Sequence, residues 1–386
     1  MRGRLLRTEW RAESDVTSDL IQEAERQRKF YTLDGLRGVA AIAVAMFHFA
    51  PLVAPVMLGS SYLAVDLFFL MSGFVIAYSY ERKFASGMGV GKFMLVRVIR
   101  LYPMYILGTA IFALPIAAAL LMRKDLVWTV GGFSTAMASA LLMLPSPPIP
   151  GKSLTLFVLN PPAWSLFYEL LSNLLFAAIF PVLSDRIVKL LIAVSALGLV
   201  ASAFAFGNLE GGAHWNDFVV GFARVGFSFF LGVLLCRLHR LKRLPAWRVP
   251  PVMILIASVA VLSISVSAGA RPFFDLFAVI ALFPLLVIAA LANEPKANIR
   301  AYTVPGLISY PLYTIHMPAL ALVTGVMAKF TGGRVEQFAP AIGIALIVVL
   351  ALAAWGLAQT YDVAARKMLT RLTARFGSGL KAHSAP

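Results

Sequence analysis

Apolar runs of about 20 residues recur along this chain from Gly35 to near Gln359, separated by short polar stretches. Each run is long enough to cross the hydrocarbon core of a bilayer as a helix, and none alternates apolar and polar residues as a strand of a membrane barrel would. Only 13% of the 386 residues are charged, against roughly 25% in an ordinary soluble domain. The sequence therefore predicts an all-α, polytopic integral membrane bundle.

About ten transmembrane helices are expected from the positions of these runs. They are placed at 35–54, 62–80, 101–122, 163–183, 187–206, 218–236, 250–268, 272–292, 305–328 and 338–361. The stretch 126–144 is ambiguous, because it is apolar but contains Gly131, Gly132 and several Ser and Thr residues. Its assignment depends on the sidedness of the neighbouring spans.

Sidedness follows from the basic clusters after the second, sixth and tenth spans, since Lys and Arg are retained on the cytoplasmic side of a membrane. Both termini are then cytoplasmic. Arg100 and Arg237 can share one side only if an even number of spans separates them, and four spans already do so. We therefore expect 126–144 to be re-entrant or interfacial, although Arg123 and Lys124 then lie outside against the charge rule.

One membrane domain accounts for most of the chain. Residues 1–30 are polar and of mixed charge, without the apolar core of a secretory signal, and are expected to form a cytoplasmic segment. Residues 31–364 form the membrane-embedded domain, and residues 365–386 a basic cytoplasmic tail. The net charge of +16 is attributed to orientation, because basic residues cluster between apolar runs, so no nucleic-acid partner is expected. Cys236 is the single cysteine, which leaves no disulfide framework and no thiolate metal cluster.

Arg37 and His48 are eleven residues apart in the first span, about three helical turns, and therefore lie on one stripe roughly 16 Å apart. Arg37 is near the cytoplasmic end, where an arginine can also snorkel to lipid phosphates. Asp66 opens the second span at a depth close to that of His48. A carboxylate beside an imidazole can fix its tautomer and make it a general base. The alternative is a structural polar pair that joins two helices.

Arg97 and Arg100 are three residues apart and share one face of a helix that enters the membrane from the cytoplasm. Arginines in this position suit a phosphorylated ligand such as a nucleotide or coenzyme A. The alternative is anchoring to lipid headgroups.

Further polar residues occur within the later spans. Trp164 belongs at the outer interface, and Glu169 lies about one and a half turns deeper, where a buried carboxylate is a functional candidate. Arg224 and His316 lie within apolar spans, where Arg224 can neutralise Glu169 and His316 can be a structural histidine. No HExxH, CxxC, Walker or GxGxxG pattern is present, so zinc hydrolysis, nucleotide hydrolysis and dinucleotide redox chemistry lack support.

Taken together, the motifs resemble the acyltransferase-3 family of bacterial integral membrane O-acyltransferases. The matching pieces, in order from about Thr32 to Ala364, are "LDGLRGVAAIAVAMFH", "FFLMSGF", "RVIRLYP", "WSLFYE" and "SYPLYTIH". The resemblance implies a multi-pass enzyme of the bacterial inner membrane, of the single-domain type. Such an enzyme moves an acyl group, usually acetyl from acetyl-CoA, to a hydroxyl of a glycan, lipid-linked saccharide or similar acceptor. The motifs do not specify the acceptor or the acyl chain length.

The resemblance also implies roles for the residues singled out above. Arg97 and Arg100 would hold the coenzyme A phosphates, and Arg37 would guide the donor or close the inner gate. His48, oriented by Asp66, would deprotonate the acceptor hydroxyl, and a covalent acyl-histidine relay stays open as an alternative. The residues assigned to acceptor binding are Trp164, Glu169, Arg224 and His316. No metal is required, and the partners are acyl-CoA, the hydroxylated acceptor and membrane lipids.

A transporter of a polar or lipid-linked solute is the competing class, because it would use the same intramembrane charges. The sequence contains no inverted repeat and no matching pair of Gly/Pro-broken helices, which disfavours it. Binding or hydrolysis of acetyl-CoA by the purified protein would separate the two classes. A purely structural scaffold comes third, since it would not need so many buried charges.

Overall fold

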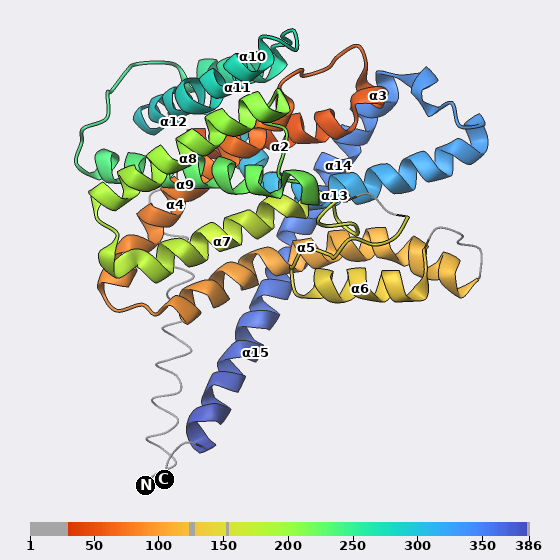
Figure 1. Ribbon diagram of the computed structural model, residues 1–386, viewed down its shortest axis with the longest axis horizontal. Coiled ribbons are helices and arrows are strands. Elements are labelled where there is room, and N and C mark those ends of the chain that lie inside the picture. The colour runs from red at the N-terminus through yellow and green to blue at the C-terminus, as the bar shows by residue number, and fades with distance from the viewer. Residues whose placement is uncertain (1–29, 123–127, 152–153, 384–386) are drawn as a thin grey trace.

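The computed structural model describes residues 30–122, 128–151 and 154–383, and its regular secondary structure is helical. Within these ranges the helices are α2 (Tyr31–His48), α3 (Ala50–Val53), α4 (Ala64–Ala85), α5 (Val90–Leu121), α6 (Val130–Leu141), α7 (Ala163–Ile179), α8 (Asp185–Phe206), α9 (Phe218–Arg240), α10 (Pro251–Ser263), α11 (Arg271–Phe277), α12 (Phe283–Ala292), α13 (Arg300–Thr331), α14 (Ala341–Gln359) and α15 (Tyr361–His383). Figure 1 shows them as one bundle. The expected all-α architecture is confirmed.

Eight helical segments in the described part of the chain are long and apolar enough to cross a membrane. They are Ser61–Ala85, Val90–Leu121, Ala163–Val182, Asp185–Phe206, Trp215–Arg240, Arg271–Ala292, Arg300–Thr331 and Ala341–Ala374. Helix α2, with 18 residues, and helix α10, with 13, occupy the other two expected spans. The protein is therefore a polytopic, multi-pass membrane protein.

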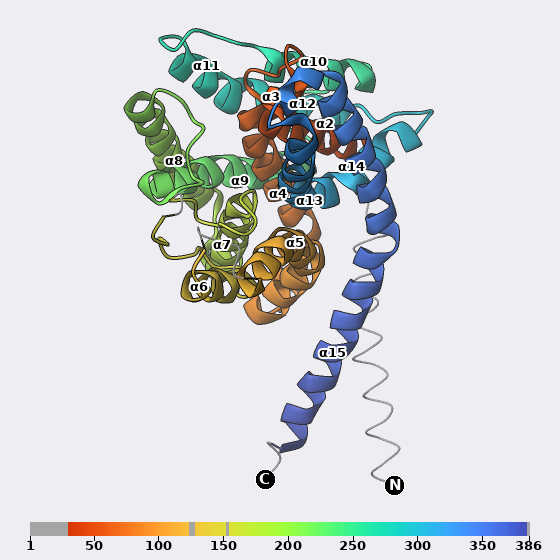
Figure 2. The same ribbon diagram turned by 90° about the vertical axis from the view of Figure 1, so that its right-hand side faces the viewer.

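Helix α6 occupies the ambiguous stretch 126–144 and has only 12 residues. At about 1.5 Å per residue it is roughly 18 Å long, well short of a hydrocarbon core of about 30 Å. It lies alongside α5 in both views (Figures 1 and 2). This length agrees with a re-entrant or interfacial segment. Arg123 and Lys124, which bear on the charge rule, lie outside the described residues.

Helices α4 and α9 pack closely through glycines. A Cβ atom placed on Gly73 of α4 would overlap the backbone of Phe229 in α9, and one placed on Gly232 of α9 would overlap the carbonyl oxygen of Leu70 in α4. In lipid there is little hydrophobic force between helices, so close backbone approach at small residues is a main source of helix association. The two glycines therefore fix how α4 sits against α9.

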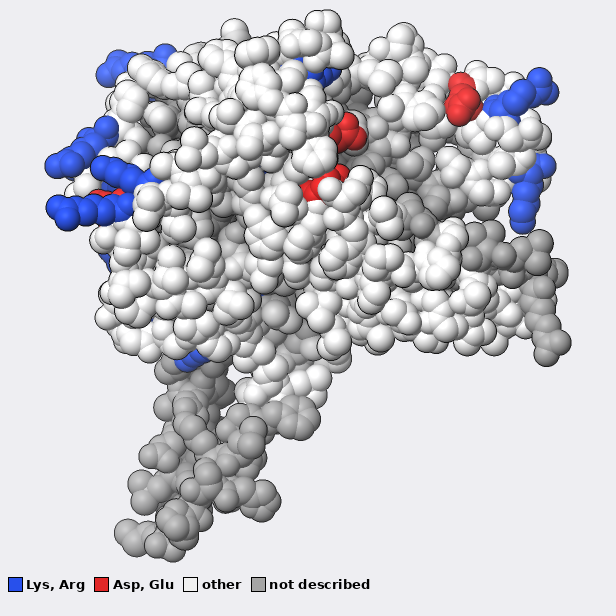
Figure 3. Space-filling view, in the orientation of Figure 1, with Lys and Arg blue, Asp and Glu red and all other residues white. Residues whose placement is uncertain are grey.

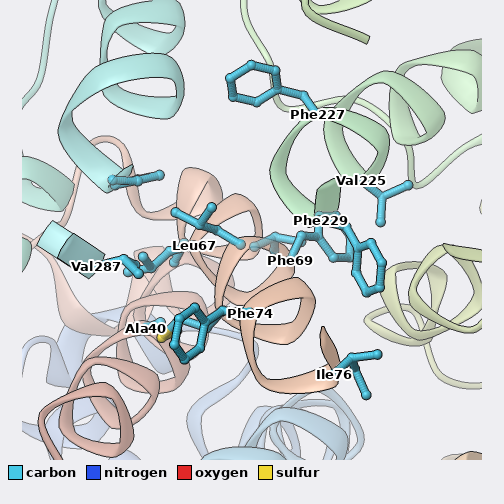
Figure 4. Close-up of a cluster of buried hydrophobic side chains, with 14 of the residues drawn as sticks. Ala40, Leu67, Phe69, Phe74, Ile76, Val225, Phe227, Phe229 and Val287 are labelled. Atoms are coloured by element: carbon cyan, nitrogen blue, oxygen red, sulfur yellow. The ribbon is translucent and has the colours of Figure 1, made fainter. Parts of the chain in front are cut away.

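The core formed by these helices is apolar and shared with α2 and α12. Figure 4 shows Ala40 of α2, Leu67 and Phe74 of α4, Phe229 of α9 and Val287 of α12 gathered together. Each of these side chains is 0% exposed. Segments far apart in the sequence thus meet in one interior, which positions the polar residues described below.

Most of the basic residues on one face lie toward its edges. In the face shown in Figure 3, Lys and Arg gather mainly at the left and right, and the largely uncharged surface between them exposes a few acidic side chains near its centre. Helix α15 follows α14 and extends beyond the other helices (Figure 2). It contains most of the stretch expected to form a basic tail from residue 365 onward.

We predict that Gly232→Val destabilises the bundle, because the added branch meets backbone rather than a movable side chain. Overpacking of this kind costs about 1–3 kcal/mol. The measurement is thermal unfolding of detergent-purified protein. Gly356→Val in α14 is the matched control, since a Cβ atom there meets nothing within 4 Å. Equal melting of the two variants would contradict the close α4–α9 contact.

Topology is testable with single cysteines in a Cys236→Ala background. We predict that an impermeant thiol reagent added outside labels Thr129→Cys and Leu154→Cys, which flank α6, because α6 does not cross the membrane. Arg243→Cys, after α9, should react only when the membrane is permeabilised. Labelling of residues 129 and 154 from opposite sides of the membrane would show that α6 crosses it.

Candidate functional site

A cavity opens between α2, α4, α5, α7 and α13, and it encloses about 860 Å³ of empty space including its open mouth. Its walls are apolar side chains such as Phe68, Phe69 and Leu166, with a set of polar groups among them. The polar lining residues are Arg37, Ser72, Arg97, Arg100, Ser165, Glu169, Ser309, Tyr310 and Tyr313. An apolar hollow with a few convergent polar groups is the usual form of a small-molecule site.

The arginines Arg37, Arg97 and Arg100 come from two helices and reach the same cavity. Glu169 is the one acidic residue among the described lining residues, so three positive charges and one negative charge leave an excess of two positive charges. Arg100 makes no hydrogen bond or ion pair to any described residue, and among these residues Arg37 pairs only with the half-buried Asp34, at 3.7 Å. The cavity is therefore suited to an anion.

Glu169 fixes the position of Arg97. Its Oε1 accepts hydrogen bonds from Nη2 of Arg97 at 2.8 Å and from Oγ of Ser72 at 2.7 Å. Its Oε2 accepts none from the residues that the structure describes. The sequence-based alternative that paired Glu169 with Arg224 is wrong, because Arg224 is bound elsewhere.

Asp66 and Arg224 form a buried ion pair between α4 and α9, with 2.6 Å between Oδ2 and Nη2. The side chains are 0% and 1% exposed. The other donors of Arg224 bind the carbonyl oxygens of Gly211 at 2.9 Å and Tyr62 at 3.1 Å, and its guanidinium lies 5.3 Å from the ring centroid of Trp164.

The expected pairing of Asp66 with His48 is therefore corrected. A carboxylate removed from water gains more from a guanidinium, which is always charged and offers several donors, than from a neutral imidazole. The same contacts correct the expected acceptor-binding role of Arg224, because its donors are committed to the protein. Trp164 is buried against it, at 8% exposure.

His48 instead meets His316. His48 ends α2, His316 lies in α13, and the centroids of their rings are 5.1 Å apart. His316 is fully buried, and its Nδ1 lies 3.2 Å from the carbonyl oxygen of Leu312. Next to His316 is Tyr313, at 5.8 Å between centroids, and Tyr313 also lines the cavity. The histidine pair thus adjoins the cavity through one aromatic side chain.

Sequence reasoning missed several polar lining residues. Tyr313 and Ser165 have their hydroxyl oxygens 2.7 Å apart, and Ser309 and Tyr310 line the cavity beside them. All four lie inside the quoted motifs "WSLFYE" and "SYPLYTIH". The signal was therefore present, but hydroxyl groups within a helix are too common to indicate a site by themselves.

The fold and the cavity define a polytopic helical membrane protein with a cationic site inside its bundle. The family model for the acyltransferase domain of the acyltransferase-3 family matches residues 30–358, and the chain belongs to this family. It is a membrane acyltransferase.

A relative in Rhizobium radiobacter, named Protein 2 in picA locus, is 37% identical over 190 residues. The match covers 46% of this chain and 96% of that protein. No solved structure matches the chain.

We predict that Asp66→Asn destabilises the protein by about 3–5 kcal/mol, because it leaves the buried Arg224 without its counter-ion. Thermal unfolding of the purified protein measures this. Asp185→Asn is the control, since Asp185 also pairs with an arginine, Arg237, but is 59% exposed. If Asp66→Asn melts at the wild-type temperature but has lost acyl transfer, Asp66 has a catalytic role rather than a structural one.

Proposed function

We propose that this protein is an O-acyltransferase, and specifically an O-acetyltransferase, of the bacterial inner membrane. It takes the acyl group from cytoplasmic acyl-CoA and transfers it to a hydroxyl of a glycan, lipid-linked saccharide or similar acceptor. The observation that carries the proposal is the convergence of Arg37, Arg97 and Arg100 on one cavity with excess positive charge.

The arginines fit the phosphates of coenzyme A in both charge and geometry. A guanidinium binds phosphate through two parallel hydrogen bonds. Arg100 donates no hydrogen bond to any described residue, so its donors are available to a ligand. Arg97 is held in place by Glu169 and is 9% exposed, so it offers a pre-oriented charge. The cavity's apolar walls suit the uncharged pantetheine arm and the acyl chain.

His48 is proposed as the general base. It takes the proton of the acceptor hydroxyl while that oxygen forms a bond to the thioester carbonyl carbon. The carbon–sulfur bond then breaks, coenzyme A leaves as the thiolate, and the proton on His48 passes to that sulfur. In the alternative, the His48 ring nitrogen itself attacks the thioester and later passes the acyl group to the acceptor. Trapping of an acyl-protein adduct with radiolabelled acetyl-CoA would favour the second course.

Glu169 is proposed to lie where the donor and acceptor sites meet. Its Oε1 holds the donor-binding Arg97, and its Oε2, which accepts no hydrogen bond from the described residues, can accept one from a hydroxyl of the acceptor. Trp164 acts behind it by packing on the Asp66–Arg224 pair rather than by contacting the acceptor. Comparison of surface glycans from strains with and without the gene, by mass spectrometry, would identify the acceptor through a lost acetyl group.

Substitution of Arg100 should impair binding of the acyl donor, whereas substitution of His48 should impair only the transfer step. We predict that Arg100→Ala weakens acetyl-CoA binding by about 1.5–3 kcal/mol, roughly 10- to 150-fold, through loss of a charge-assisted hydrogen bond. Arg100→Lys should recover part of that affinity, because it keeps the charge but loses the bidentate geometry. His48→Ala should bind acetyl-CoA normally but transfer nothing. Calorimetry on detergent-purified protein measures the binding.

Arg243→Ala is the control for loss of an arginine, because Arg243 is exposed in the loop after α9. Unchanged affinity in both Arg97→Ala and Arg100→Ala would overturn the donor site. Failure of the wild-type protein to bind acetyl-CoA at all would favour a transporter.

A further inference from the structure

His316 has a buried nitrogen that makes no hydrogen bond. A carbonyl oxygen only accepts hydrogen bonds, so the Leu312 carbonyl at 3.2 Å assigns the ring proton of His316 to Nδ1. The Nε2 of the neutral ring is then an acceptor with a free lone pair. It is buried and has no partner in the described part of the chain. Buried polar groups without partners are rare, so this nitrogen requires an explanation.

His48 is the donor within reach. Three rings lie near that of His316, those of His48, Phe49 and Tyr313. Phe49 has no donor, and the Tyr313 hydroxyl is directed at Pro162 and Ser165, at 3.1 and 2.7 Å. The ring nitrogens of His48 make no hydrogen bond to any residue in the described ranges.

The separation of the two rings fits a hydrogen bond between them. A ring nitrogen lies about 1.1 Å from the centroid of an imidazole, so two imidazoles joined by an N–H···N bond of about 2.9 Å have centroids about 5.1 Å apart. The observed separation is 5.1 Å. The His316 ring therefore keeps its contact with Leu312, and the bond requires only that the His48 ring turn a nitrogen toward Nε2 of His316. Such bonds often tighten only when substrate is bound.

We propose that His316 is a positioning residue for His48: its Nε2 accepts a hydrogen bond from the imidazole N–H of His48 and so holds the other His48 nitrogen as the base. The proposal rests on the proposed function. His316 thereby takes the orienting role that Asp66 cannot take while it binds Arg224. No proton is transferred to His316, since the proton from the acceptor stays on His48 until it passes to the departing thiolate.

Two substitutions at His316 separate this role from packing. His316→Phe keeps a ring but has no acceptor, whereas His316→Gln keeps an oxygen acceptor near the position of Nε2. Thr314→Val is the control, because Thr314 is a buried neighbour on α13 that hydrogen-bonds only within its own helix. Transfer is measured from radiolabelled acetyl-CoA to envelope polysaccharide from a strain that lacks the gene.

His316→Phe should lower kcat by about 10- to 1000-fold with the KM for acetyl-CoA unchanged, and His316→Gln should recover part of the loss. Thr314→Val should transfer as the wild type does. Wild-type kcat in His316→Phe would overturn the proposal, as would a change in KM alone. A loss in His316→Phe that His316→Gln does not recover would also count against it.

A second measurement does not depend on transfer. In protein labelled with ¹⁵N-histidine and reconstituted in lipid, solid-state NMR should show the His316 Nε2 resonance displaced by its hydrogen bond, and His48→Ala should return it to the position of a free imidazole nitrogen. An identical resonance in the two proteins would refute the pairing. If the pairing is seen but no acyl transfer occurs with any acceptor, the proposed function fails and the pairing stands.

Discussion

The buried ion pair between Asp66 and Arg224 is the interaction on which the rest of the bundle depends. A charge in the bilayer interior must find a partner, because no water is present to solvate it. Arg224 meets this requirement with bonds to α4, to the Tyr62 carbonyl before it and to the Gly211 carbonyl before α9. The hydroxyl of Tyr62 in turn donates to Asp275 of α11. One polar network thus joins α4, α9 and α11.

This network determines which charges are left for a ligand. Asp66 is occupied by Arg224, and one oxygen of Glu169 is occupied by Arg97 and Ser72. The protein therefore supplies no further described carboxylate to the cavity, whose arginines keep their excess positive charge. A cationic cavity in a low-dielectric bundle is unfavourable when empty of anions and attracts one strongly. Because Asp66 is paired with Arg224, the arginines of the cavity are left to bind an anion.

The sequence was sufficient for the helices and for placing Arg97 beside Arg100 on one helix face, because span length and helical periodicity are local properties. Arg37 lies on another helix and was grouped with them only through the family resemblance. The sequence was insufficient for the partners of Asp66 and His48. Depth in the membrane can be read from position along a span, and it placed both residues at a similar level. Which side of each helix faces which neighbour depends on packing, here on Gly73 against α9 and on α2 against α13. Equal depth was therefore mistaken for contact.

Helix α2 connects the two ends of the proposed reaction. It places Arg37 at the cavity and His48 three turns further along, beside His316, with Tyr313 between the cavity and the histidine pair. Under the proposed function, the phosphates of the donor stay at the arginines while the thioester reaches toward the base at the other end of the same helix. The acyl group then crosses part of the bilayer without coenzyme A crossing it. A rigid helix suits this purpose, because its fixed rise per residue holds the two ends at a constant separation during turnover.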